Sequence, residues 1–161
     1  MGEKAMVLFS GGIDSTTCLA LAIEKYGKEN VIPLSVFYGQ KHEKEVEAAS
    51  IALSLDCQVI YYGAHMDDAA GNAYPDCSQA FYDSMNQAVW EGSGKALRIE
   101  APFINQNKAQ IVARGLELKA PYQFTWSCYE GKERPCGVCG TCIDRRKAFE
   151  ANGIKDPALG E

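Results

Sequence analysis

Four of the seven cysteines fall within fifteen residues near the end of the chain, at spacings typical of a metal-binding loop. The pattern is Cys128-x7-Cys136-x2-Cys139-x2-Cys142. Four thiolates suit tetrahedral Zn²⁺, and a site with no open position is structural. An odd cysteine count also disfavours a full disulfide framework. An iron–sulfur cluster is the competing interpretation, although the usual trailing Cys-Pro is missing. The spacing therefore predicts a structural zinc site.

A glycine turn near the start of the chain is the second chemical signal. The run Ser10-Gly11-Gly12-Ile13-Asp14-Ser15 follows an apolar stretch and precedes an amphipathic one, which predicts strand, tight turn and helix. The glycines let the backbone approach a ligand, and free N–H groups at the helix start bind anions. Neither GxxxxGK[ST] nor GxGxxG is present. The plainer interpretation is a Gly-Gly turn with Asp14 as a helix cap.

The segments that would position these groups alternate between strand and helix. This alternation predicts an α/β fold, a Rossmann-like three-layer sandwich with a mostly parallel sheet. The glycine turn would then lie at the carboxyl edge of the sheet, where such folds bind ligands. The expected strands are 5–9, 31–38, 59–62, 97–101 and 123–126, and the expected helices are 14–26, 41–55, 78–89, 107–118 and 145–151.

Length and charge narrow the class of protein. A chain of 161 residues with 47% hydrophobic content suits one domain over residues 1–161, with a zinc subregion at 126–146. The net charge of -5 and the absence of a basic stripe argue against a nucleic-acid partner. No stretch approaches the ~20 apolar residues of a membrane helix, and the first residues lack a signal-peptide pattern. We therefore expect a cytoplasmic enzyme without a membrane partner.

Several motifs together resemble a known family. The SGGxDS run is similar to the pyrophosphate loop of the N-type ATP pyrophosphatases. Tyr38–His42 reads YGQKH, Asp68–Gly71 precedes the YPDC run Tyr74–Cys77, and Thr125–Tyr129 leads into the cysteine loop. With the cysteine spacing, these segments resemble the 7-cyano-7-deazaguanine synthases of the queuosine pathway over nearly the whole chain.

The resemblance implies a reaction. That family converts 7-carboxy-7-deazaguanine and ammonia into the nitrile through adenylated carboxylate and amide intermediates, with ATP and Mg²⁺ as co-substrate and AMP and pyrophosphate as products. It also implies a homodimer. The residues that would bind ATP are Phe9, Ser10, Gly11, Gly12, Ile13, Asp14, Ser15, Thr16 and Tyr38.

The resemblance also suggests roles for individual side chains. Asp14, Lys108 and Asp68 would be catalytic, with the lysine on a phosphate and an aspartate on Mg²⁺ or substrate. Each has a plainer interpretation, as a solvated helix lysine or a carboxylate bonded to its own loop. Arg145 and Arg146 would reach an anion, with surface charge favoured for at least one of them. The residues that would contact the deazaguanine acid are Gln40, His42, Tyr74 and Asp76.

The chain departs from the family pattern near Ala49–Ser50. Several dozen residues, including a strand and a P-x-R-N motif, are expected there and are absent. A natural shortening would put catalysis in question, whereas a segment merely left out of this sequence would leave the enzyme interpretation intact. One rival function is another ATP pyrophosphatase, tRNA-modifying or amidating, in which Cys77 would be a nucleophile. The other is an inactive, zinc-stabilised nucleotide-binding module.

Overall fold

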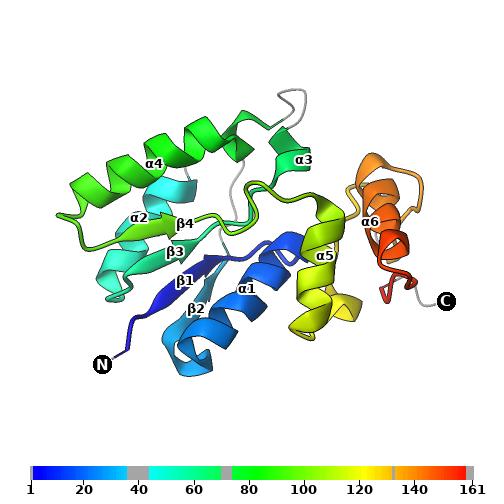
Figure 1. The fold of residues 1–161 in the computed structure, drawn as a ribbon, viewed down its shortest axis with the longest axis horizontal. Helices are drawn as coiled ribbons and strands as arrows, with labels where there is room; N and C mark the ends of the chain where they lie inside the picture. The colour runs from blue at the N-terminus through cyan, green and yellow to red at the C-terminus, as the bar shows by residue number, and fades with distance from the viewer. Residues whose placement is uncertain (1, 36–43, 70–73, 132, 159–161) are drawn as a thin grey trace.

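A single parallel sheet forms the centre of the molecule (Figure 1). The structure, a computed structural model, describes residues 2–35, 44–69, 74–131 and 133–158. Among these residues four strands lie side by side in the order β2-β1-β3-β4. Ala5 pairs with both Val31 and Val59, so β1 is central. The strands are β1 Ala5–Leu8, β2 Val31–Leu34, β3 Val59–Tyr61 and β4 Arg98–Glu100.

Helices cover both faces of the sheet, so the structure has three layers (Figure 1). Alternate strand residues point to opposite faces: Val7 packs against the layer of α1, α5 and α6, and Met6 against that of α2 and α4. The central strands β1 and β3 read as continuous apolar runs, as strands buried on both faces do, whereas β4 has Arg98 and Glu100 on either side of the buried Ile99. The helices are α1 Ile13–Tyr26, α2 Lys44–Ser54, α3 Met66–Ala69, α4 Gln79–Gly92, α5 Lys108–Glu117 and α6 Gly140–Ala151, with 3₁₀ turns at Lys28–Asn30, Pro75–Cys77 and Tyr122–Phe124.

The predicted α/β class and parallel sheet are confirmed, but the strand predicted at 123–126 is wrong. That segment begins as the 3₁₀ turn Tyr122–Phe124, which the Thr125 N–H closes on the Tyr122 carbonyl at 3.1 Å. The Trp126 N–H then donates to the Gly11 carbonyl at 3.0 Å. Its backbone therefore bonds to the glycine turn, and it pairs with no strand in the part of the chain that the structure describes.

Two further boundaries differ from the sequence prediction. The last helix starts at Gly140 and not at 145, with Cys139 as its N-cap, so the final cysteine of the cluster is already helical. The loop predicted between β3 and α4 contains the short helix α3. The strand predicted over 31–38 ends at Leu34, with Ser35 already outside it, and residues 36–43 lie outside the described part.

The fold gathers several loops at the carboxyl ends of the strands. In Figure 1 the glycine turn after β1, the loop after β3 with α3, and the start of α5 all lie on this side, and α6 lies beyond α5. The N-terminus of α5 is fixed by a capping box between Asn107 and Gln110, which satisfies two backbone donors at once. No helix in the described residues has both the length and the apolar character to cross a membrane.

Candidate active site and metal centre

The glycine turn has the geometry of an anion-binding loop. Gly11 has φ of +80°, a conformation that side chains with a Cβ rarely adopt. Gly12 is the N-cap of α1 and supplies no side-chain cap, so the first N–H groups of the helix have no intrahelical partner. The Ser15 hydroxyl accepts from the Ser10 N–H at 3.2 Å and lies 3.1 Å from the Ser10 hydroxyl. The predicted strand, turn and helix are therefore confirmed, and ATP binding stays a prediction.

Three elements bring a cluster of charged side chains to the start of α1. Lys108 Nζ at the N-terminus of α5 donates to Asp14 Oδ2 at 2.6 Å. His65, from the loop after β3, places Nε2 3.0 Å from Asp68 Oδ2 and 3.6 Å from Asp14 Oδ2. Lys108 Nζ also lies 3.0 Å from the same imidazole nitrogen. The three residues predicted to be catalytic therefore lie together, with His65 between them.

The cluster is charged and only partly solvated. Burial acts to raise the pKa of Asp14, but His65 and Lys108 outweigh it and the pKa lies below its ordinary value. Burial acts to lower the pKa of His65, but hydrogen bonds to Asp14 and Asp68 raise it to about 9. Lys108, whose Nζ lies beside the ring, acts to lower this pKa but does not outweigh the two carboxylates. Among the described residues, Asp14 Oδ1 and His65 Nδ1 are buried without a hydrogen-bond partner.

Of the cavities that meet at this cluster, two also border the glycine turn. One of about 330 Å³ extends from the end of β1 to Tyr62 and Cys77, and one of about 360 Å³ extends from the glycine turn to the segment before the cysteine loop. Their sizes suit small-molecule ligands. Four residues line both cavities: Ser10, Asp14, Asp68 and Tyr129.

The predicted substrate contacts are only partly described. Tyr38, Gln40 and His42 lie outside the described residues. Tyr74 is exposed next to the 3₁₀ turn Pro75–Cys77. The backbone carbonyl of Asp76 accepts a hydrogen bond from the Tyr62 hydroxyl at 2.9 Å, which pins this turn to the end of β3.

Cys77 lines the first cavity but is a poor nucleophile. Its sulfur lies 3.9 Å from the Tyr62 hydroxyl. Burial and the nearby Asp68 raise the pKa of Cys77 to about 11. Because the thiolate is the reactive form of cysteine, this environment disfavours the rival function that needs Cys77 as a nucleophile.

His65 is the one member of the charged cluster that sequence reasoning missed. It is fully buried, and no motif marks it. A signal was present, since His65 lies three residues before Asp68, just beyond the strand Val59–Tyr61, where α/β folds place ligand-binding side chains.

The two arginines after the cysteine loop have different roles. Arg145 is buried and donates to both carboxylate oxygens of Asp156, with Nη2–Oδ1 at 2.8 Å. It also donates to Thr125 Oγ1 at 2.7 Å and to the Tyr122 carbonyl at 3.2 Å. Arg146 is exposed and lies 4.0 Å from Glu150. Surface charge therefore describes Arg146, and Arg145 anchors the segment that leads into the cysteine loop.

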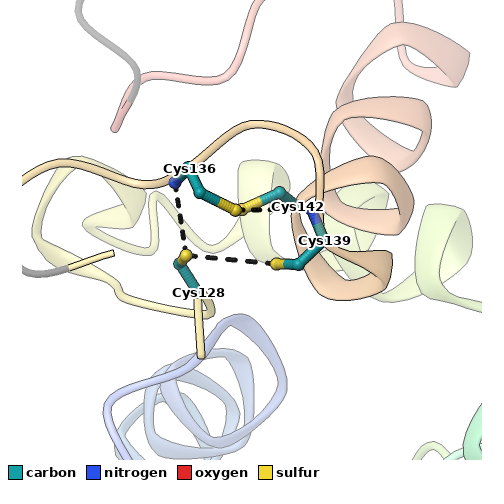
Figure 2. Close-up of side chains that lie close together, drawn as sticks. All are labelled: Cys128, Cys136, Cys139 and Cys142. Atoms are coloured by element: carbon teal, nitrogen blue, oxygen red, sulfur yellow. Dashed lines mark hydrogen bonds between the residues drawn. The ribbon is translucent and has the colours of Figure 1, made fainter. Parts of the chain in front are cut away.

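The four clustered cysteines converge on one point (Figure 2). Their sulfur atoms all lie within 4.8 Å of one another, and the Cys136–Cys142 and Cys128–Cys139 sulfur distances are both 4.0 Å. All four are free of disulfides. Tetrahedral coordination with Zn–S of about 2.3 Å requires sulfur–sulfur distances of roughly 3.8 Å. The predicted four-cysteine cluster is thus confirmed as a group able to hold a metal ion.

Backbone geometry prepares these sulfurs as ligands. The N–H groups of Gly131 and Cys136 donate to Cys128 Sγ at 3.0 and 3.3 Å. These bonds lower the pKa of Cys128, and the bond from the Cys136 N–H has the largest effect. The Thr141 hydroxyl does most to lower the pKa of Cys139, to about 6. A Cβ on Gly131 would lie 2.2 Å from the Arg134 carbonyl oxygen, so only glycine fits there. Donor set and geometry both suit Zn²⁺.

A parallel sheet covered by helices, a glycine turn at its carboxyl edge and a four-cysteine loop beside that edge define a Rossmann-like α/β protein with a cysteine cluster able to hold a metal ion. The chain belongs to the family described as "Queuosine biosynthesis protein QueC", whose model matches residues 4–54 and 48–153. It is 33% identical to a 7-cyano-7-deazaguanine synthase of Archaeoglobus fulgidus, covering 98% of this chain and 90% of that protein. It is 32% identical to one of Caldicellulosiruptor bescii, covering 96% of each.

These matches contain gaps on the side of this chain. The alignment with the Archaeoglobus protein runs over 220 positions, more than the 161 residues present here. The two segments matched by the family model overlap at residues 48–54, which lie in α2. One helix of this chain therefore matches two separate stretches of the family pattern.

Proposed function

We propose that this protein is an ATP-dependent 7-cyano-7-deazaguanine synthase, which converts 7-carboxy-7-deazaguanine and ammonia into the nitrile for queuosine biosynthesis. Family membership and the names of the relatives support the reaction. The observation that carries its mechanism is the cluster of Asp14, His65, Asp68 and Lys108 beside an uncapped helix start.

The first step activates the carboxylate. A carboxylate oxygen of the substrate attacks the α-phosphorus of ATP, the bond to the bridging oxygen breaks, and pyrophosphate leaves. The free N–H groups at the start of α1 and the Ser10 and Ser15 hydroxyls would bind the departing anion. Lys108, now 2.6 Å from Asp14, would move to a pyrophosphate oxygen, leaving Asp14 with His65.

Ammonia then completes the conversion. Its nitrogen attacks the acyl carbon, AMP leaves with one former carboxylate oxygen, and an amide forms. The amide oxygen attacks the α-phosphorus of a further ATP, and loss of AMP with the amide protons gives the nitrile. Both activations release pyrophosphate, so one anion site serves both. No protein nucleophile is needed, which agrees with the raised pKa of Cys77.

Mg²⁺ fits this arrangement. When bound with ATP, it would neutralise charge on the leaving pyrophosphate. Carboxylate oxygens are its preferred protein ligands, and Asp14 Oδ1 is a buried carboxylate oxygen with no partner in the described part of the chain. Asp14 is therefore the residue that would hold Mg²⁺, with Asp68 contacting it or the substrate.

The cysteine loop would hold structural Zn²⁺ through Cys128, Cys136, Cys139 and Cys142. Bound to these four residues, the ion would cross-link the loop and neutralise the thiolates, and four protein ligands would leave no position open for substrate. We further propose a single domain over residues 1–161, with an internal segment lost near Ala49–Ser50, as the overlap of the two matched segments supports. By analogy with the family, we propose a homodimer in the cytoplasm.

Purified protein incubated with ATP, Mg²⁺, ammonium and the deazaguanine acid tests the function. We expect nitrile by mass spectrometry and AMP whose formation requires the acid. Lys108→Ala should lose both products, and Lys28→Ala is the matched control because Lys28 is an exposed lysine of the 3₁₀ turn before β2 and lines none of the cavities at the charged cluster. ATP binding without AMP for any acid would favour the inactive module, and AMP formation with tRNA alone would favour another ATP pyrophosphatase.

A further inference from the structure

Tyr129 is an exposed aromatic residue at the meeting point of the two cavities. It directly follows the cysteine ligand Cys128 and lines both cavities beside the charged cluster. Its side chain remains 75% exposed. An exposed aromatic ring gains stability when a flat ligand covers it, so this position suits contact with a heteroaromatic substrate.

The segment around Tyr129 is fixed at two points. The Trp126 N–H bonds to the Gly11 carbonyl in the glycine turn at 3.0 Å. The Trp126 indole N–H donates to the Cys128 carbonyl at 2.7 Å, and Cys128 belongs to the metal cluster. The glycine turn and the cysteine loop therefore set the position of Tyr129, so its ring need not be ordered by the ligand itself.

A second tyrosine approaches from the opposite loop. The Tyr74 phenol lies within hydrogen-bonding reach of the Tyr129 phenol. Tyr74 precedes the 3₁₀ turn Pro75–Cys77, and it is itself 40% exposed. The two phenols come from distant parts of the chain. Asp68, like Tyr129, lines both cavities.

We propose that Tyr129 is a specificity-determining residue that packs its ring on the flat deazaguanine base, with Tyr74 closing the other side. The inference rests on the proposed function and deepens it by naming the wall that recognises the base. In this position the base lies between the segment of Tyr74 and the segment of Tyr129. The carboxylate of the substrate then faces Asp14 and Lys108. The cysteine loop then acts as part of the substrate site as well as a structural cross-link.

The test is a comparison of Michaelis constants. Tyr129→Ala should raise KM for the deazaguanine acid at least about tenfold, since base–aromatic stacking contributes about 1–3 kcal/mol per base. KM for ATP should change less than twofold, and Tyr129→Phe should recover most of the affinity. Phe124→Ala is the matched control, because Phe124 is 83% exposed and lines none of the cavities described here.

Binding can be followed without turnover. In a Trp90→Phe background Trp126 is the remaining tryptophan, so quenching of its fluorescence by the acid reports occupancy next to Tyr129. An unchanged KM for the acid in Tyr129→Ala, or equal effects of Phe124→Ala, overturns the proposal. A change of oligomeric state with unchanged KM also overturns it and assigns Tyr129 to a contact between copies. Wild-type protein that forms no nitrile would instead contradict the proposed function.

Discussion

The charged cluster and the cysteine cluster lie close together but are stabilised in different ways. In the first, opposite charges from α1, α3 and α5 neutralise one another through direct contacts at 2.6 to 3.6 Å. In the second, four sulfurs of the same kind converge, and burial raises the pKa of Cys142 to about 12 while that of Cys139 falls to about 6. Neighbouring thiolates repel, so only a bound cation lets all four ionise.

The two clusters therefore differ in whether a bound ion is required for their stability. The charged cluster is held by contacts between its own side chains, and under the proposed mechanism Lys108 would exchange Asp14 for a pyrophosphate oxygen. The cysteine loop would need a bound cation for all four thiols to ionise, and hydrogen bonds of Trp126 connect this loop to the glycine turn. We therefore expect metal removal to affect both regions, and changes in the charged cluster to leave the metal in place.

Loss of the metal should have the largest effect. Cys136→Ser should abolish Zn²⁺ binding, whose apparent free energy is about 10–16 kcal/mol in zinc-finger peptides, and lower Tm by on the order of 10 °C. Metal content and calorimetry measure both. Cys77→Ser, outside the cluster, is the control and should keep its metal. Equal Tm values with and without metal would remove the distinction between the two regions.

Removal of the Arg145 side chain, which anchors the segment before the cysteine loop, should have the second-largest effect. Arg145→Met leaves Asp156 buried and unpaired, which should cost about 3–5 kcal/mol of unfolding free energy. Urea unfolding measures the loss. Arg146→Met, on the exposed side of the same helix, should change it by less than about 1 kcal/mol. Similar losses in both variants would mean that the Arg145 contacts do not anchor the loop.

A change in the charged cluster should affect catalysis more than the metal. Lys108→Met removes a donor to the leaving pyrophosphate, so kcat for AMP formation should fall about 10²–10³-fold. Zn²⁺ content should stay at the wild-type level. The control Lys28→Met should keep both the wild-type kcat and the wild-type Zn²⁺ content, because Lys28 is exposed and distant from the cluster. If Lys108→Met lost its metal, the two regions would be one folding unit and the comparison would fail.

The smallest effect concerns pH. Because the folded-state pKa of His65 is raised from 6.5 to about 9, its stabilising contribution is complete below about pH 6.5 and is lost as the pH rises through about 9. His65→Gln should lack this part of the pH dependence of unfolding free energy. Parallel slopes in the two proteins between these pH values would show that His65 is not charged in the folded state.

Sequence patterns identified the chemistry better than its arrangement. The glycine turn and the cysteine spacing are local, so their geometry follows from short-range rules, and both are seen in the structure. His65 was missed because its importance depends on contacts with Asp14 and Lys108, which are distant in the chain.

Long-range contacts also explain the wrong strand prediction at 123–126 and the buried position of Arg145. Gln123–Trp126 has the composition of a strand, but its backbone bonds to Gly11, which only the folded structure brings near. Arg145 looks like surface charge until Asp156 and Thr125 surround it. Long-range contacts outweigh local propensity in each case.

The path of the substrate oxygens tests the account most directly. Deazaguanine acid labelled with heavy oxygen in both carboxylate positions is incubated with ATP and ammonium, and the nucleotides are analysed by mass spectrometry. The account predicts that each AMP carries one labelled oxygen and that pyrophosphate carries none. Labelled inorganic phosphate with ADP, or AMP without label, would contradict attack of the carboxylate on the α-phosphorus.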